Sequence, residues 1–487
     1  MNEVNKNAIF LVAIISTLTI LAGMFISQVT IYTSFIALAA LIVAIICFVN
    51  TEIALYILII AMLLGPQFVA GGGAETVAIR GRALTLRIDD LLLIVIGASW
   101  FAKTSIKKEL GLFLKTPLNR PIAYYFIACL VSTILGVMMD RVKPTLGFFF
   151  ILKYFEYFIV YFMAVNHLHE KKQIERFVLT LLLVCFIVCV IGMLQIPSGV
   201  RVSAPFEGTE GEPNTLGGYL VLMLSITLGL LLTRGLKKFR LFFYVLVTFI
   251  LITLAATLSR SSWISLIPML LTLFYFSKRK MFIMITLLLL LVASPILLPK
   301  SVLERAFFTI GQPKEAGQIQ IGNVRIDTST SARIESWKKV LFKDFYKNAI
   351  LGYGVTGYTF VDAQYPRVLL ETGILGLITF LLLIRAIFKN AVYAYRNTKD
   401  DPSFNGLALG YLAGLMAMLV HAIGTNTFII VRIMEPFWFL TAMIIMIPSI
   451  EKGQTGQDSA ARITADRPSA PKKLPWAIQT EELHLGK

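Results

Sequence analysis

The chain has 487 residues, of which 57% are hydrophobic and only 15% are charged, and its formal net charge is +17. This composition excludes a water-soluble globular domain, whose surface requires more charged residues. A net positive charge suits a nucleic-acid-binding protein, but its distribution along the chain argues against nucleic acid as a partner. All four cysteines fall within apolar runs, so we expect buried thiols rather than metal ligands.

Long continuous apolar runs dominate the sequence. Such runs predict helices rather than barrel strands, which would alternate apolar and polar residues. We therefore expect an all-α, polytopic transmembrane helix bundle of about 12 to 14 helices. The first run is expected to be an uncleaved helix rather than a signal peptide. In chain order the predicted spans are 8–27, 31–49, 52–70, 89–102, 121–139, 146–166, 177–196, 215–233, 241–257, 262–277, 281–299, 367–388, 404–425 and 430–449.

Lysine and arginine gather in alternate loops between these spans. The basic loops are 103–120, 171–176, 234–240, 278–280 and 389–399. Because basic loops mark the cytoplasmic side of a membrane, the pattern predicts that both termini are cytoplasmic. The outward-facing loops would then be 71–88, 197–214, 258–261 and 300–366. Most of the unusual polar motifs fall in these outward loops, so we expect the chemistry on that side.

Three parts of the chain follow from these boundaries. Residues 1–199 are predicted to form N-terminal transmembrane helices. Residues 200–449 are predicted to form a second membrane domain, which contains the large outward loop at 300–366. Residues 450–487 form a tail that is rich in glycine, serine, proline and charged residues, and its lack of apolar periodicity predicts disorder.

Arginines in the outward loops are candidates for binding an anionic ligand. Arg260 lies between two spans, Arg201 precedes an acidic loop, and Arg333 lies in an amphipathic segment that Ser329 or Thr330 would cap as a helix. A guanidinium suits phosphate because it forms two parallel hydrogen bonds. The alternatives are that Arg260 extends to lipid headgroups and that Arg333 lies on a solvated surface.

Two carboxylates lie beside the span at 367–388. Pro366 limits the start of that helix, so Asp362 belongs to the preceding loop. Glu371 and Arg367 are one helical turn apart and can pair with each other. A carboxylate at this membrane surface can also act as a general base.

Further polar residues have simpler interpretations. Lys153 and Glu156, three residues apart within a span, are expected to neutralise each other, and His421 is expected to make an interhelical hydrogen bond. Gly352-Tyr-Gly354 predicts a turn with close backbone packing rather than a phosphate-binding loop. Arg87 and its neighbouring arginines in the first outward loop are expected to lie near lipid phosphates.

Several of these motifs, taken together, resemble the O-antigen ligase and O-antigen polymerase superfamily. The resemblance covers roughly residues 200–445. It rests on Glu212-Pro-Asn-Thr-Leu-Gly-Gly-Tyr219, Leu258-Ser-Arg-Ser-Ser-Trp263, Ser331-Ala-Arg-Ile-Glu-Ser-Trp337, Gly352-Tyr-Gly354, the run Asp362 to Gly376, and Arg432-Ile-Met-Glu-Pro-Phe-Trp438.

The resemblance implies a GT-C-like membrane glycosyltransferase that uses sugars on a polyprenyl pyrophosphate carrier. By position, Arg260 and Arg333 would engage the pyrophosphate, and Asp362 would activate the acceptor. Ligases of the family typically have His followed by Asn at this last position, whereas this chain has Asp362 followed by Ala363. That departure favours a polymerase of lipid-linked repeat units for O-antigen or exopolysaccharide, as in lipopolysaccharide biosynthesis.

The expected reaction is inverting, because one base acts by direct displacement. The sequence offers no metal-ligand cluster of suitable spacing, so we expect neither a metal nor a cofactor. Arg201, Asn214, Arg367 and Glu371 complete the predicted substrate-binding set, and Glu371 is the alternative base. The expected partners are the lipid-linked glycan donor, the glycan acceptor, the lipid bilayer of the bacterial inner membrane, and a chain-length regulator or flippase. Two alternatives stay open, namely an O-antigen ligase acting on lipid A core and a polysaccharide or lipid transporter.

Overall fold

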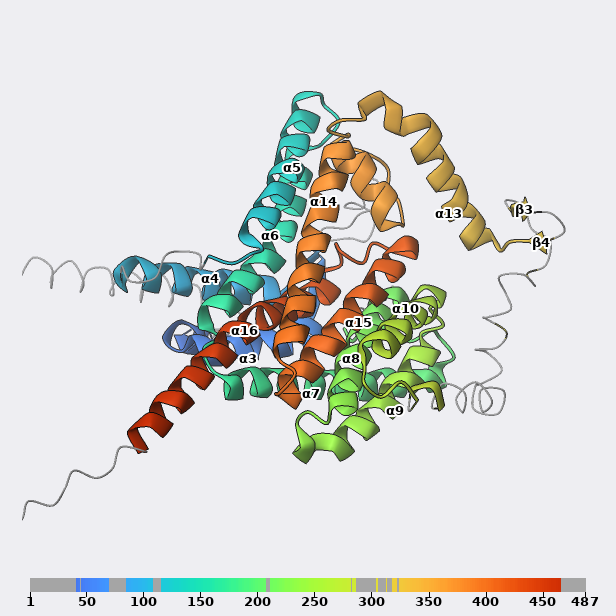
Figure 1. Ribbon diagram of the computed structural model, residues 1–487. Coiled ribbons are helices and arrows are strands. Elements are labelled where there is room, and N and C mark those ends of the chain that lie inside the picture. Colours follow the sequence, from blue (N-terminus) through green and yellow to red (C-terminus); the bar gives the residue numbers. More distant parts are fainter. Residues whose placement is uncertain are drawn as a thin grey trace, which may run out of the picture.

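The computed structural model describes residues 41–43, 45–69, 85–107, 115–206, 211–281, 283–285, 304, 312, 318–321 and 324–465. Nearly all of its regular structure is helical, as Figure 1 shows. The helices are α3 (Thr51–Leu64), α4 (Ile88–Lys107), α5 (Asn119–Met138), α6 (Pro144–His167), α7 (Lys171–Gln195), α8 (Pro213–Thr233), α9 (Arg240–Ala256), α10 (Arg260–Phe276), α13 (Thr328–Lys339), α14 (Gln364–Asn397), α15 (Pro402–Gly424) and α16 (Val431–Ala465).

Eight of these helices, α5 to α9 and α14 to α16, are long and apolar enough to cross a membrane. They coincide with predicted spans, which confirms the all-α polytopic bundle. Three more predicted spans correspond to α4 and to the shorter helices α3 and α10, which have 14 and 17 residues. The predicted span at 8–27, and most of those at 31–49 and 281–299, lie outside the described residues.

The described strands are short and form two antiparallel pairs. Strand β1 (Gln67–Val69) pairs with β2 (Thr85–Arg87), with Phe68 opposite Leu86. Strand β3 (Gln320–Ile321) pairs with β4 (Val324–Arg325) just before α13. Each pair closes a loop between helices and leaves the fold class unchanged.

The core of the bundle is formed by α8, α15 and α16. Of the most apolar window of α8, 89% is buried, against 28% for the window that contains α9. Small residues explain the tight contact between α8 and α15. A Cβ added to Gly229 would lie 2.3 Å from the carbonyl oxygen of Gly406 and 2.6 Å from the Cα of Gly410. Such close approach of backbones is the usual way in which membrane helices associate without a hydrophobic driving force.

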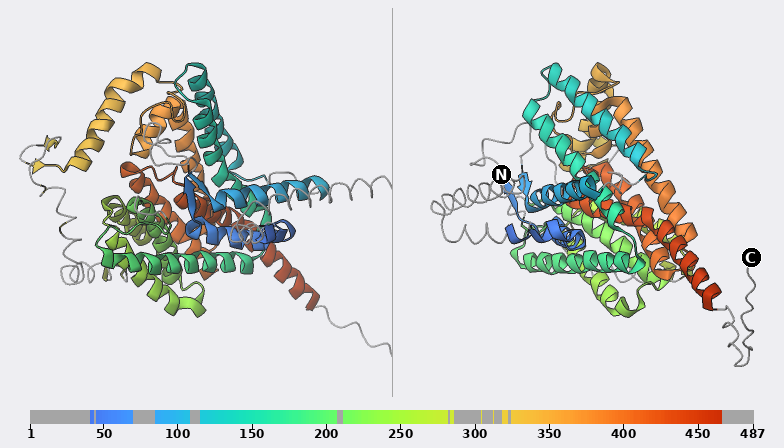
Figure 2. Two further views of the ribbon diagram at one scale, coloured as in Figure 1. Left: turned by 180° about the vertical axis from the view of Figure 1, so that it is seen from behind. Right: turned by 90° about the vertical axis from the view of Figure 1, so that its left-hand side faces the viewer.

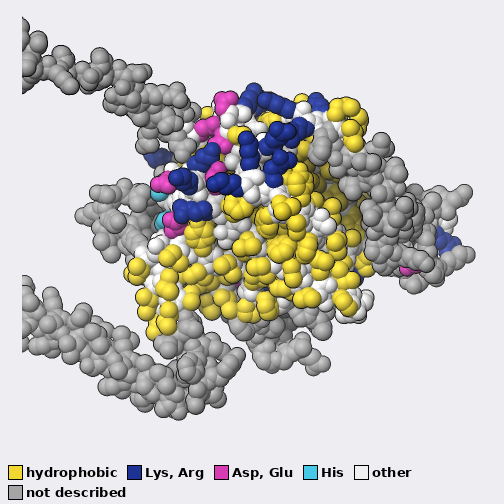
Figure 3. All heavy atoms as spheres, turned by 90° about the horizontal axis from the view of Figure 1, so that it is seen from below, with side chains coloured by type: hydrophobic (Ala, Val, Ile, Leu, Met, Phe, Trp, Pro, Cys, Tyr) yellow, Lys and Arg dark blue, Asp and Glu magenta, His cyan; other side chains and the backbone are white. Residues whose placement is uncertain are grey.

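The remaining helices surround this core. Figure 2 shows α3, α4 and α7 lying side by side and crossing the direction of α5 and α14, which pack against each other. Figure 3 shows the face seen from below, where Lys and Arg side chains gather over one part and hydrophobic side chains cover a broad area beside it. This separation is the arrangement expected where a membrane protein leaves the apolar bilayer for water.

Helix α14 is interrupted at Gly373, which adopts φ +67° and ψ −167°. A residue other than glycine is disfavoured there, because a Cβ would lie 2.2 Å from the carbonyl oxygen of Ile350. The interruption frees two carbonyl groups. The amides of Tyr353 and Gly354 donate to the carbonyls of Leu370 and Glu371, at 2.8 and 2.9 Å. The glycine-rich turn is therefore a backbone packing element, as its sequence predicts.

The last helix differs from its predicted end. Helix α16 continues to Ala465, whereas the predicted span ends at residue 449 and the predicted disordered tail begins at 450. Residues 466–487 lie outside the described residues. In Figure 1, α16 extends away from the bundle over this last part, so the additional turns lie beyond the packed core.

Candidate functional site

An arginine and an aspartate from two family motifs meet at the end of the bundle. Arg333, on α13, donates from Nη2 to Oδ2 of Asp362 at 2.9 Å. The two side chains are 27% and 40% exposed, so both are accessible from solvent. Asp362 lies in the loop before α14, as predicted. The pair thus presents a cation suited to phosphate and an anion able to accept a proton at one accessible place.

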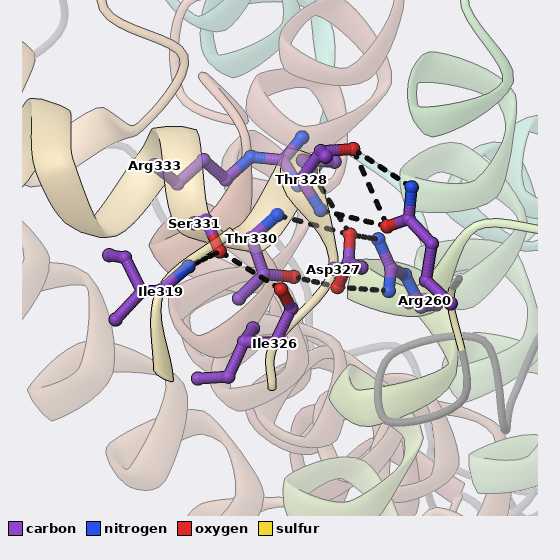
Figure 4. A network of polar contacts seen from close by, with 10 residues as sticks. Arg260, Ile319, Ile326, Asp327, Thr328, Thr330, Ser331 and Arg333 are labelled. Atoms are coloured by element: carbon purple, nitrogen blue, oxygen red, sulfur yellow. Dashed lines mark hydrogen bonds and ion pairs between the residues drawn. The ribbon is translucent and has the colours of Figure 1, made fainter. Parts of the chain in front are cut away.

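Arg260 is held by a carboxylate that the sequence motifs do not include. Its Nη1 and Nη2 donate to Oδ2 and Oδ1 of Asp327, at 2.8 and 2.9 Å (Figure 4). Asp327 also caps α13, because its side chain accepts from the amides of Ser329 and Thr330. The expectation that Ser329 or Thr330 caps this helix was therefore wrong. Asp327 is the N-cap because its carboxylate accepts hydrogen bonds from both amides and from the guanidinium of Arg260 at once.

The pair between Arg260 and Asp327 connects α13 to the bundle. Figure 1 places α13 at the edge of the molecule, and the second pair of strands lies beyond it. Burial acts to raise the pKa of Asp327, but the hydrogen bonds from Arg260 and Thr330 lower it to about 2. The aspartate is therefore ionised at any physiological pH. A bidentate, charge-assisted contact of this kind fixes orientation as well as distance, and it positions the helix that carries Arg333.

Arg201 and Asn214 support the loop that carries Arg260. The side chain of Arg201 donates to the carbonyl oxygens of Thr257 and Leu258, at 3.0 and 3.2 Å. Asn214 accepts from the hydroxyl of Ser259, the N-cap of α10, at 2.7 Å. Both residues therefore contact the turn between α9 and α10. They stay proposed substrate-binding residues, and their observed contacts position the neighbouring arginine.

A chain of polar side chains runs from this turn into the core. Ser259 contacts Ser262 at 2.8 Å, and Ser262 contacts Nε2 of His421 at 3.1 Å. The Nδ1 atom of His421 in turn contacts the hydroxyl of Thr427 at 2.7 Å. The histidine is fully buried. Its expected role in an interhelical hydrogen bond is confirmed, since it joins α15 to α10.

Glu212 is the site carboxylate that sequence reasoning did not single out. It is the N-cap residue of α8. Burial raises its pKa, and the negative charge of Asp362 raises it further, whereas Thr215, Arg333 and Arg201 act in the opposite direction. The ionisation of Glu212 is therefore coupled to the Arg333–Asp362 pair. One signal in the sequence points to this residue, namely its position immediately before Pro213 and Asn214 in a motif of the family. We had treated Glu212 only as one member of the acidic loop.

The other predicted pair, Arg367 and Glu371, lies in a different environment. The two side chains are 5% and 4% exposed and their Nε and Oε1 atoms are 3.3 Å apart. Glu371 also accepts from the hydroxyl of Tyr154 and from the amide of Thr356, at 3.4 and 3.3 Å. The predicted pairing is confirmed. The glutamate is thereby occupied on both oxygens, next to the break in α14.

Two other predictions concern residues that lie in a buried cluster of charged side chains. Lys153 contacts Glu156 at 3.1 Å, as expected, but also contacts Asp90. Arg87, expected near lipid phosphates, is buried and lies 2.9 Å from Asp89. Interior carboxylates compete successfully for this arginine, because their charge is not screened by water. The neighbouring arginines Arg80 and Arg82 lie outside the described residues.

Taken together, the fold and this site define a multi-pass membrane protein with a polar site at the end of its helical bundle. Residues 244–381 match the family model described as O-antigen ligase. The match confirms, over this segment, the resemblance to the O-antigen ligase and polymerase superfamily that the motifs indicate. No curated protein matches the chain.

The matched segment covers part of the site. It contains Arg260, Arg333, Asp362, Arg367 and Glu371, but ends short of Arg201, Glu212 and Asn214 on the N-terminal side. The family supports a membrane glycosyltransferase of the O-antigen ligase or polymerase type. Arg201, Glu212 and Asn214 lie outside the matched segment, and only the fold brings them near its residues.

Proposed function

We propose that this protein polymerises oligosaccharide repeat units carried on polyprenyl pyrophosphate, with inversion at the anomeric carbon. The observation that carries the proposal is the accessible pair of Arg333 and Asp362 inside the matched family segment. Cleavage of a sugar–pyrophosphate bond leaves negative charge on the departing carrier. A fixed guanidinium stabilises charge that develops in this way without a metal ion.

The arginines would divide the work. Arg333 is paired with a partly exposed carboxylate, so a pyrophosphate can compete for it. Arg260 is engaged by Asp327, whose side chain is 1% exposed. In this proposal Arg260 adds positive charge to the site and holds α13 in place, and Arg201 and Asn214 hold the turn beneath it.

Asp362 would accept the proton of the acceptor hydroxyl as that oxygen attacks the sugar. Its contact with Arg333 is replaced by phosphate in the donor complex, which frees the carboxylate for the acceptor. Glu212 is the nearest alternative, since burial raises its pKa and makes it the stronger base once ionised. Glu371 is less suitable, because Arg367, Tyr154 and Thr356 already contact it.

The test compares three carboxylates in the purified protein with a synthetic lipid-linked donor. Asp362→Asn should bind donor normally and lose turnover, because the amide preserves shape and removes the base. Glu212→Gln and Glu371→Gln serve as matched amide variants. Normal turnover of Asp362→Asn, with a loss in one of the other two, would assign the base to that residue and contradict the proposal.

The carrier of the product separates a polymerase from a ligase. We expect longer glycans that stay on polyprenyl pyrophosphate. Transfer to lipid A core or to another acceptor would establish a ligase, which the family name also admits. Movement of glycan across proteoliposomes without any new glycosidic bond would establish a transporter, the alternative that buried charges within the bundle favour.

The orientation belongs to the same proposal. The basic loops favour cytoplasmic termini in the bacterial inner membrane, and α13 and Asp362 would then lie on the outer face. Gln318, just before β3, is a suitable probe position because its side chain is partly exposed. A Gln318→Cys variant should react with an impermeant maleimide in intact cells whose outer layers admit the reagent. Reaction only after the inner membrane is permeabilised would reverse the topology.

A further inference from the structure

A buried cluster of charged residues lies apart from the proposed transfer site. Its members come from one strand and three helices of the bundle. They are Arg87 at the end of β2, Asp89 and Asp90 on α4, Lys153 and Glu156 on α6, and Glu435 on α16. All six side chains are between 0% and 13% exposed.

The charges of this cluster do not balance. Among the residues that the structure describes, four carboxylates form ion pairs with two cationic side chains, Arg87 and Lys153. An excess negative charge in a low-dielectric interior is costly unless a bound cation or proton neutralises it. A bound cation of charge +2, or two protons, would balance the described members of the cluster.

Several carboxylate oxygens of the cluster have no hydrogen-bond partner among the described residues, and they lie close together. Glu435 is fully buried, and neither of its oxygens accepts a hydrogen bond from any residue that the structure describes. In the described part of the chain, Nη2 of Arg87 lies 3.8 Å from Oε2 of Glu435. Oε1 of Glu156 and Oδ1 of Asp89 also accept no hydrogen bond in the described part of the chain, and Oδ2 of Asp89 forms the ion pair with Arg87.

The geometry suits a single hard cation. One oxygen each from Asp89, Glu156 and Glu435 can be chosen so that all three lie within 4.8 Å of one another. Ca²⁺ holds oxygen ligands at about 2.3–2.6 Å, so two ligands on opposite sides of the ion are roughly 5 Å apart. Mg²⁺ requires about 2.1 Å and a near-ideal octahedron, which makes it the poorer fit.

We propose that Asp89, Glu156 and Glu435 bind a divalent cation of the Ca²⁺ type, which joins α4, α6 and α16. A charge of +2 balances the excess of the cluster. One turn before Glu435, Arg432 donates to the carbonyl oxygens of Leu63 and Pro205, at 3.0 and 2.9 Å. The ion would therefore also stabilise the anchor of the loop that leads to Glu212, while the transfer reaction itself stays metal-independent.

The experiment uses the full-length protein, purified in detergent after treatment with a chelator. Equilibrium dialysis against ⁴⁵Ca²⁺ should show saturable binding of one ion per chain, and the melting temperature should rise with the same concentration dependence. Glu435→Gln should bind Ca²⁺ more weakly by on the order of tenfold or more. Glu175→Gln, a carboxylate beside Lys171 at the bundle surface, should bind as the wild type does.

Two results would overturn the proposal. Absence of saturable Ca²⁺ binding in the wild type, together with a melting temperature that rises as pH falls, would mean that protons neutralise the cluster. Equal affinity in the wild type and in Glu435→Gln would place the ion elsewhere. Because the amide removes a buried charge, Glu435→Gln should fold even without Ca²⁺, and Asp89→Asn provides a second variant with the same expected loss of affinity.

Discussion

Two of the arginine–carboxylate pairs in the family segment have the same chemistry but different surroundings. Arg333 and Asp362 join two separate elements and are 27% and 40% exposed. Arg367 and Glu371 are one turn apart on α14 and only 5% and 4% exposed. Water can reach the first pair, whereas the second is enclosed by Tyr154, Thr356 and the break in the helix.

This contrast teaches that burial, rather than residue type, separates a site for ligand from a structural contact. An exposed ion pair contributes little to stability, so its partners can exchange for a ligand at low cost. A buried pair cannot lose one partner without leaving an unpaired charge in the interior. Two motifs that look equally functional in the sequence should therefore respond in opposite ways to mutation.

The largest effect is expected at the buried pair. Arg367→Ala should destabilise the protein by about 3–5 kcal/mol, because it leaves the buried carboxylate of Glu371 uncompensated. The measurement is the melting temperature and the folded yield in detergent. Arg367→Ala combined with Glu371→Gln should recover part of the loss. A single variant as stable as the wild type would show that Glu371 is protonated or otherwise compensated.

The exposed pair should show the reverse. Arg333→Ala should change stability by less than about 1 kcal/mol and abolish chain extension, and Arg333→Lys should also be poor because a point charge loses the bidentate geometry. Glycan length and melting temperature are measured on the same preparations. Normal glycan length at equal expression would leave Arg333 as a solvated surface residue.

Arg260→Ala tests whether an arginine acts on the substrate directly or by holding α13 in place. It should also stop chain extension, but by releasing Asp327 and the N-terminus of α13. Limited proteolysis should then cut near β4 and α13 faster than in Arg333→Ala. Equal protease resistance in both variants would show that Arg260 acts on the substrate rather than through α13.

The smallest effect concerns the pH dependence at Glu212. Its folded-state pKa is raised above the ordinary 4.5, so the folded protein holds this proton to higher pH than the unfolded chain does. The contribution of Glu212 to stability is present below 4.5 and declines as pH rises through the folded-state pKa. Glu212→Gln should therefore gain stability relative to the wild type as pH rises above 4.5. A difference that stays constant over this range would contradict the raised pKa.

The sequence by itself determined the class of the protein and most of its spans. Continuous apolar runs leave helices as the only solution in a bilayer, and their ends follow from local signals such as Pro213, Pro366 and Pro402. It also identified Asp362 as a loop residue, because Pro366 limits the start of the helix. It predicted the pair of Arg367 and Glu371, because that contact depends only on spacing along one helix.

Only the tertiary structure decided which charges meet. Arg260 and Asp327 are 67 residues apart in the chain, and Asp327 stands outside every motif that was recognised. Asp89, Glu156 and Glu435 lie on three helices whose order in space no local pattern encodes. Helical periodicity fixes which face of each helix is apolar, but the partner of that face is chosen by packing against other helices, and the environment of each charge follows from that choice.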